Sequence, residues 1–199
     1  LFELMIEVPK KPKAFEERVV AALTEALKVC EGDDGVRCMR LLQHCFADNP
    51  EKQELFSALV LMHDGLHVLT SRVLPSSAVL TSKALHTDTR KDASAKATLE
   101  CTRDNLRILN ALCQVIAQRC NKLMGWSAFP SAAAQVDVVE LRETLLYVQH
   151  LHNAEFLRNL IVIANHASDE PLWQELRSLS SGILLTQLWH VPILKRNVD

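Results

Sequence analysis

The sequence predicts an all-α fold, and composition is the first reason. Glycine and proline, which cost most in a helix interior, number 5 and 7 among 199 residues, whereas leucine and alanine, which cost least, are the commonest residues. Aromatic residues make up 5% of the chain and runs of β-branched residues are scarce, which argues against a β-sandwich or barrel. Because 48% of the residues are hydrophobic, we expect one domain with a sizeable core over residues 1–199.

Apolar periodicity is the second observation. Apolar residues recur at intervals of three and four, and the glycines and prolines fall where this pattern breaks, so we expect them between helices and not within them. Interpreted in this way, the sequence contains about nine helices. They are predicted over residues 14–31, 34–47, 50–62, 66–74, 93–120, 136–150, 154–167, 171–179 and 183–190.

The first two helices show apolar faces at the spacing of an amphipathic helix. The expected inward residues are Phe15, Val19, Ala22, Leu23, Ala26, Leu27 and Cys30 in the first, and Cys38, Leu41, Leu42 and Cys45 in the second.

Capping residues mark several helix ends. Asn49 followed by Pro50 predicts the start of the third helix, because asparagine is a favoured N-cap and proline suits the first helical position. Asp64 and Gly65 predict its end, and Asn153 predicts another N-cap before residues 154–167. Between the fourth and fifth helices the chain is rich in serine and threonine, and we expect a flexible loop over residues 75–92.

Charge, hydropathy and cysteine content limit the class of protein and its cellular compartment. A formal net charge of −2 argues against a generally basic nucleic-acid binder, and no apolar run is long enough to cross a membrane. None of the six cysteines belongs to a Cys-x-x-Cys pair, so we expect buried, reduced thiols and a cytoplasmic or nuclear protein. The sequence begins in mid-pattern without methionine, and we expect it to be a fragment of a longer protein.

An internal repeat follows from comparing two helix starts. Residues 48–55 and 169–176 share Asp, Pro, Gln, Glu and Leu in register, at an offset of 121 residues. Downstream, Gly65 corresponds to Gly182 after a four-residue contraction. Each copy then reads as a long amphipathic helix, a small polar turn, a capped short helix, a glycine and an apolar helix.

This order of elements resembles the armadillo repeat, most closely over Asn49-Pro50-Glu51 and Asp64-Gly65-Leu66. HEAT-like repeats or a non-repetitive α-superhelix would give a similar pattern. The resemblance implies a right-handed superhelix of stacked helices, in which each unit buries its apolar face against its neighbours. It also implies that the long third helices line a concave surface that binds partners.

Polar stripes lie opposite the apolar faces of the three long helices. The residues predicted to bind a partner there are Arg37, Arg40, His44, Arg103, Arg107, Asn110, Gln114, Arg158 and Asn165, and Gln43 and Gln118 belong to the same stripes. Arginine and carboxamide groups suit directed hydrogen bonds to a peptide backbone or to carboxylates. We therefore expect a groove that binds an extended or helical segment of another protein, with acidic side chains favoured. The alternative is that these stripes are only solvated helix faces.

The asparagine ladder of armadillo proteins that bind extended peptides is not found. Counting back six residues from the two aligned turns reaches Gln43 and Ala164, so nuclear-import function is not carried over.

The sequence contains little that indicates a catalytic or metal site. His63 and His67 have a metal-ligand spacing, but Gly65 interrupts the helix between them. The thiols lack a His and acid at a recognisable spacing, and there is no glycine-rich phosphate loop. We predict no catalytic residue, no metal, no cofactor and no enzyme activity.

Two alternatives to peptide binding stay open. One is a structural module that docks or self-associates through its apolar ends, with Trp189 near the C-terminal end as a contact. Packing of Trp126, Trp173 and Trp189 on the chain's own core is the simpler expectation. The other alternative is a helical repeat that binds nucleic acid through the same arginines.

Overall fold

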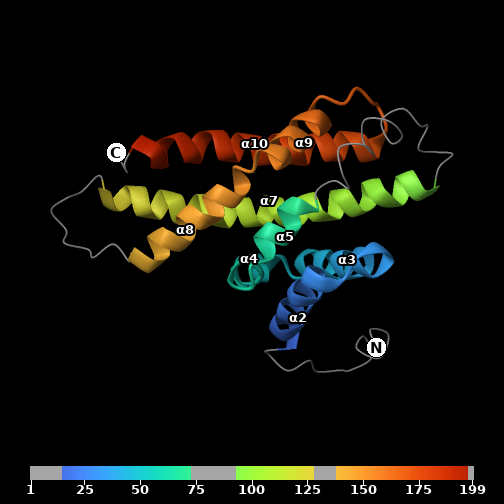
Figure 1. Ribbon diagram of the computed structural model, residues 1–199, viewed down its shortest axis with the longest axis horizontal. Helices are drawn as coiled ribbons and strands as arrows, with labels where there is room; N and C mark the ends of the chain where they lie inside the picture. The colour runs from blue at the N-terminus through green and yellow to red at the C-terminus, as the bar shows by residue number, and fades with distance from the viewer. Residues whose placement is uncertain (1–14, 73–92, 128–137, 197–199) are drawn as a thin grey trace.

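The computed structural model describes residues 15–72, 93–127 and 138–196 (Figure 1). Within these ranges the chain forms eight α-helices and one 3-10 turn, and no strand, so the all-α prediction is confirmed for this part. The loop predicted at residues 75–92 lies outside the described residues, as do the side chains of Trp126 and Trp189. No described helix is both long and apolar enough to cross a membrane.

The first half of the chain follows the predicted elements closely. It consists of α2 (Phe15–Val29), α3 (Gly32–Asp48), the 3-10 turn η1 (Pro50–Lys52), α4 (Gln53–Met62) and α5 (Gly65–Ser71). The inward faces agree with the prediction in part: Leu27 and Leu42 are fully buried as expected, but other fully buried positions were not predicted. In α2 the fully buried residues are Val20, Thr24 and Leu27, and in α3 they include Met39, Leu42 and Phe46.

Side-chain size and hydrogen bonding explain these additional buried positions. Thr24 can be buried because its hydroxyl donates to the Val20 carbonyl at 2.8 Å. In α3 the bulkier Met39 and Phe46 enter the core, while Cys38 and Cys45 lie half-buried beside them.

The second half is built around one long helix. It consists of α7 (Ala93–Ser127), α8 (Val138–Leu151), α9 (Ala154–Ala164) and α10 (Pro171–Arg196). α7 contacts α3, α4, α5, α8 and α10, and α10 runs alongside it (Figure 1). Because α7 touches elements from both halves of the chain, it links the two halves of the core.

Two helices predicted at residues 171–179 and 183–190 are wrong, because α10 is continuous from Pro171 to Arg196. Gly182, predicted as a corner, lies inside α10 and does not have a left-handed backbone. Leu176 and Ile183 are fully buried on either side of this glycine. Packing along α7 therefore outweighs the intrinsic helix cost of glycine, which is about 1 kcal/mol. Gly125 and Pro192 also lie within helices, contrary to the expectation.

The break predicted at Asp64 and Gly65 is confirmed. α4 ends at Met62, Asp64 adopts a left-handed backbone with φ 54°, and α5 begins at Gly65. Gly65 is not needed for a left-handed turn, because its own φ is not positive. A Cβ atom there would lie 2.6 Å from Val60 Cγ1 and 2.7 Å from Thr24 Cγ2. The missing side chain thus lets α2, α4 and α5 meet.

The two predicted asparagine caps behave differently. The Asn153 side chain accepts hydrogen bonds from the backbone N–H groups of Glu155 and Phe156, at 2.9 and 3.3 Å, and so caps α9. The Asn49 side chain makes no capping bond and instead donates to the Cys45 carbonyl at 3.0 Å. At the Asn49 position there is therefore no side-chain cap, but Pro50 still begins η1 at the predicted residue.

A single hydrophobic cluster joins all these helices. It extends from Val20 in α2 through Phe56 and Leu106 to Trp173 and Ile183 in α10. Trp173 is 2% exposed, which confirms that it packs on the chain's own core.

Candidate binding groove

Part of the polar stripe predicted on α7 lines a cavity of about 350 Å³. We name this the amide cavity, because four of its side chains are carboxamides. Its polar lining consists of Gln43 from α3, Gln53 from α4, and Arg107, Asn110 and Gln114 from α7. Its apolar lining includes Phe46, Ile108, Ala111 and Leu179. Three of the nine predicted binding residues are thereby brought together, with Gln43 from the first stripe.

Helix geometry explains why the α7 residues converge. Arg107, Asn110 and Gln114 are separated by three and four residues, so they lie on one face of the helix. Leu109 and Leu112 are fully buried on other sides of α7, which holds this face in place.

The carboxamides of the cavity have no hydrogen-bond partner within the part of the chain that the structure describes. None of the side-chain hydrogen bonds there involves Gln43, Gln53, Asn110 or Gln114. Gln43, Gln53 and Asn110 are half-buried, and Gln114 is exposed. Their donors and acceptors are therefore available to a ligand.

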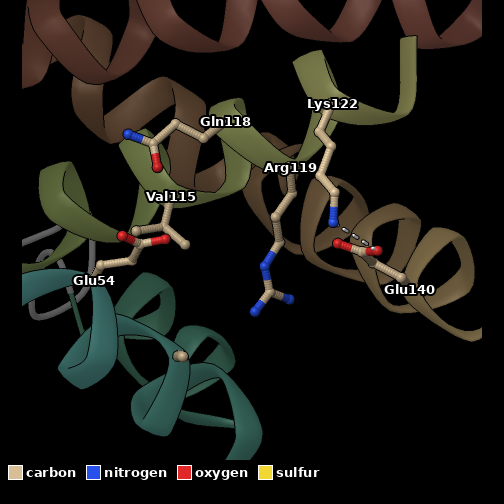
Figure 2. Close-up of a pocket in the computed structure, with 7 residues that line it drawn as sticks. Glu54, Val115, Gln118, Arg119, Lys122 and Glu140 are labelled. Carbon is tan, nitrogen blue, oxygen red and sulfur yellow. Dashed lines mark ion pairs between the residues drawn. The ribbon is translucent and has the colours of Figure 1, made fainter. Parts of the chain in front are cut away.

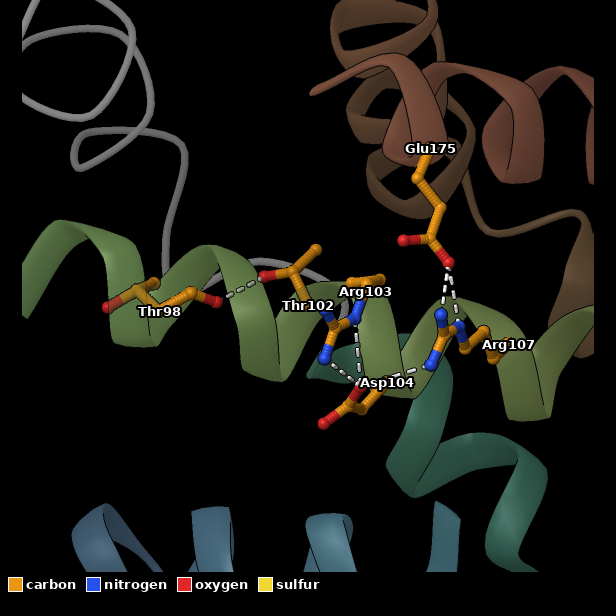
Figure 3. Close-up of polar contacts among 6 residues, drawn as sticks. All are labelled: Thr98, Thr102, Arg103, Asp104, Arg107 and Glu175. Carbon is orange, nitrogen blue, oxygen red and sulfur yellow. Dashed lines mark hydrogen bonds and ion pairs between the residues drawn. The ribbon is translucent and has the colours of Figure 1, made fainter. Parts of the chain in front are cut away.

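Arg107 is already bonded to other residues of the chain. Its Nε donates to Glu175 Oε1 at 2.8 Å, which ties α7 to α10, and its Nη1 lies 4.0 Å from Asp104 Oδ1 (Figure 3). Arg103 donates from Nε and Nη2 to the same Asp104 oxygen, at 3.0 and 2.9 Å. Asp104 is 4% exposed. The two central arginines of the predicted stripe thus satisfy internal acids.

The other predicted residues do not line the amide cavity. Besides the half-buried Arg103 on α7, they are five residues: Arg37, Arg40 and His44 on α3, Arg158 on α9, and Asn165 at the end of α9. All five are exposed. Arg37 Nη1 lies 3.6 Å from Asp34, and Asn165 donates to the Ile161 carbonyl at 2.9 Å.

A second cavity, of about 220 Å³, lies further along α7 between α4 and α8 (Figure 2). We name it the charged cavity. Its lining consists of Glu54 and Ala58 from α4, Val115, Gln118, Arg119 and Lys122 from α7, and Glu140 from α8. Lys122 Nζ pairs with Glu140 Oε2 at 3.5 Å. Arg119 lies against Tyr147 of α8, with its Cζ 6.0 Å from the ring centre.

Arg119, Glu54 and Gln53 line these cavities but were not predicted from the sequence as groove residues. Gln118 was part of the predicted stripe, and continuing that stripe by four residues reaches Lys122, whereas Arg119 lies about 100° around the helix from Gln118 and off the stripe. For Gln53 and Glu54 the sequence carries no comparable indication, because their role depends on where α4 meets α7.

The thiols do not form a nucleophilic site. Burial raises the pKa of Cys113 to about 12 and that of Cys120 to about 11, so these groups stay protonated near neutral pH. Burial likewise raises the pKa values of Cys38 and Cys101. All six cysteines are free, and only Cys113 and Cys120 are fully buried, so the expectation of buried thiols holds for two of them.

The two histidines at metal-ligand spacing face different neighbours. His63 Nδ1 lies 2.9 Å from Glu25 Oε1 on α2, whereas the His67 ring lies 5.4 Å from the His150 ring on α8. Among the described residues, no three His, Cys, Asp or Glu side chains come together in a way that could hold a metal ion.

Comparisons of the chain with protein-family models, with curated proteins and with solved structures find no match. The amide cavity and the charged cavity are therefore interpreted from their own chemistry.

Proposed function

We propose that this chain is a protein–protein interaction domain that binds an extended or helical segment of a partner along α7. The observation that carries the proposal is the amide cavity, where four carboxamides without partners in the described chain surround one space. Three helices, α3, α4 and α7, supply them, so the cavity depends on the tertiary fold and not on one helix face.

The chemistry of the lining favours a peptide backbone as ligand. A carboxamide offers both a donor and an acceptor, which matches the alternating C=O and N–H groups of a peptide. Arg107 adds little net charge, because Glu175 neutralises it. Phe46 and Leu179 supply an apolar wall that an apolar side chain of the segment can contact.

Several finer expectations stay predictions. The armadillo-type superhelix, the absence of enzyme activity and the cytoplasmic or nuclear setting belong among them. The groove does not depend on the repeat, since it needs only the observed meeting of α3, α4, α7 and α10.

A phage-displayed library of linear peptides, panned on the purified chain, tests the proposal. We expect enriched peptides whose affinity falls about tenfold or more in the double variant Asn110→Leu, Gln114→Met, because two hydrogen bonds at about 1 kcal/mol each are lost. The matched control is Gln149→Met, an exposed glutamine of α8 outside both cavities. Circular dichroism checks that each variant keeps its helices.

Two results would contradict the proposal. One is a library that yields no enriched peptide, and the other is undiminished peptide binding by the double variant. Binding of an RNA or DNA oligonucleotide that weakens steeply with salt would instead favour the nucleic-acid alternative.

A further inference from the structure

Arg119 is a cation without an acidic partner at the wall of the charged cavity. Within the part of the chain that the structure describes, no carboxylate forms an ion pair with it, and it lies against the ring of Tyr147. Figure 2 shows its guanidinium projecting between α4 and α8, away from the Lys122–Glu140 pair. Its interactions with the Tyr147 side chain leave the guanidinium without an acidic partner, so its charge can attract an anionic ligand.

Glu54 balances this charge from the opposite wall. It lines the same cavity, is exposed, and forms no ion pair within the described ranges. Because Lys122 and Glu140 already neutralise each other, the cavity offers one unpaired cation and one unpaired anion. Such a pair accepts a single carboxylate and repels a second one placed near Glu54.

The two cavities are consecutive along α7. Gln114 lines the amide cavity and Val115 the charged cavity, while the neighbouring Gln53 and Glu54 of α4 line one each. Asn110 and Arg119 are separated by about 13 Å along the helix axis, at 1.5 Å per residue, and by about half a turn around it, at 3.6 residues per turn. A segment that joins the two cavities therefore also passes part of the way around α7.

We propose that Arg119 receives one acidic side chain of the bound segment, outside the part seated in the amide cavity, and that Glu54 disfavours a second acid beside it. This inference rests on the proposed function. The partner is thus a segment with an isolated Asp or Glu, and not an acidic run. The guanidinium can bind that carboxylate through two parallel N–H donors, and the Tyr147 ring limits its motion.

The test uses the peptides enriched on the wild-type chain, with affinity measured by fluorescence anisotropy. We expect one recurrent Asp or Glu, and replacing it with Asn or Gln should weaken wild-type binding about tenfold, as expected for a charge-assisted hydrogen bond. The same replacement in the peptide should hardly change its affinity for the Arg119→Gln variant. The Arg119→Lys variant should still bind the acidic peptide more tightly than the amide peptide, but by a smaller factor than the wild-type chain does. Arg142→Gln, an exposed arginine of α8 outside both cavities, is the matched control.

Glu54→Gln supplies an independent arm. It should raise the affinity for peptides that carry two adjacent acids, with little change for those that carry one. Equal wild-type affinity for acidic and amide peptides, or a preference for acidic runs, would overturn the inference while leaving the groove intact. Undiminished binding by Asn110→Leu, Gln114→Met would instead overturn the proposed function and this inference with it.

Discussion

Replacing Gly182 with alanine tests whether α10 runs unbroken through the position where the sequence predicts a corner. The glycine lies inside Pro171–Arg196 and has no left-handed backbone. A Cβ atom there would have Asn110 Oδ1 as its nearest neighbour, at 3.6 Å, which is an ordinary van der Waals contact. The added methyl group therefore needs no movement of α7.

The magnitude follows from helix propensity. Alanine is favoured over glycine in a helix interior by about 1 kcal/mol, so Gly182→Ala should raise the free energy of unfolding by that amount. For a domain of this size the melting temperature should rise by about 2–4 °C. If residue 182 were instead a left-handed corner, alanine would cost about 1–2 kcal/mol, and the sign would be reversed.

Gly32→Ala is the matched control for the backbone. Gly32 has φ +56° and no atom within 4 Å of its Cβ position, so alanine there carries the conformational cost alone. Urea denaturation followed by circular dichroism should show the midpoint rising for Gly182→Ala and falling for Gly32→Ala. A lower midpoint for Gly182→Ala, with an unchanged dependence on urea, would refute a continuous α10.

Three further predictions concern the core, a cap and the thiols. Gly65→Ala should lower the free energy of unfolding by about 1–3 kcal/mol in urea denaturation, because its Cβ would overlap neighbouring atoms; an unchanged midpoint would contradict that packing. Asn153→Ala should cost about 1 kcal/mol in the same assay, and more than Asn49→Ala, since only Asn153 caps its helix; equal losses would contradict this assignment. At pH 8, iodoacetamide should modify Cys38 faster than Cys113, whose thiol is buried and has a pKa raised to about 12; equal rates by mass spectrometry would show that the core opens readily.

The helices were largely predictable, because their formation depends on local sequence. The predicted span 14–31 is observed as Phe15–Val29, and the predicted break at Asp64 occurs there. Caps were predictable as positions but not as hydrogen bonds, as Asn49 and Asn153 show. The local sequence predicts where a cap can form. Whether the asparagine side chain then bonds to the N–H groups of the helix depends on which other groups lie within its reach.

The candidate site was predictable only in part. Arg107, Asn110 and Gln114 could be placed on one face of a helix from their spacing alone. That Arg107 pairs with Glu175 could not be foreseen, because the two residues meet only when α10 packs on α7. The same holds for Arg119, whose setting is made by α4 and α8.

By itself the amino-acid sequence determined that the chain is helical and where most helices begin and end, because propensity and capping act over a few residues. Tertiary structure alone decided that α10 continues through Gly182, which residues of α2 and α3 face inward, and which polar side chains share a cavity. These features depend on contacts between segments distant in sequence, where burying apolar surface across several helices outweighs the small local cost of one residue.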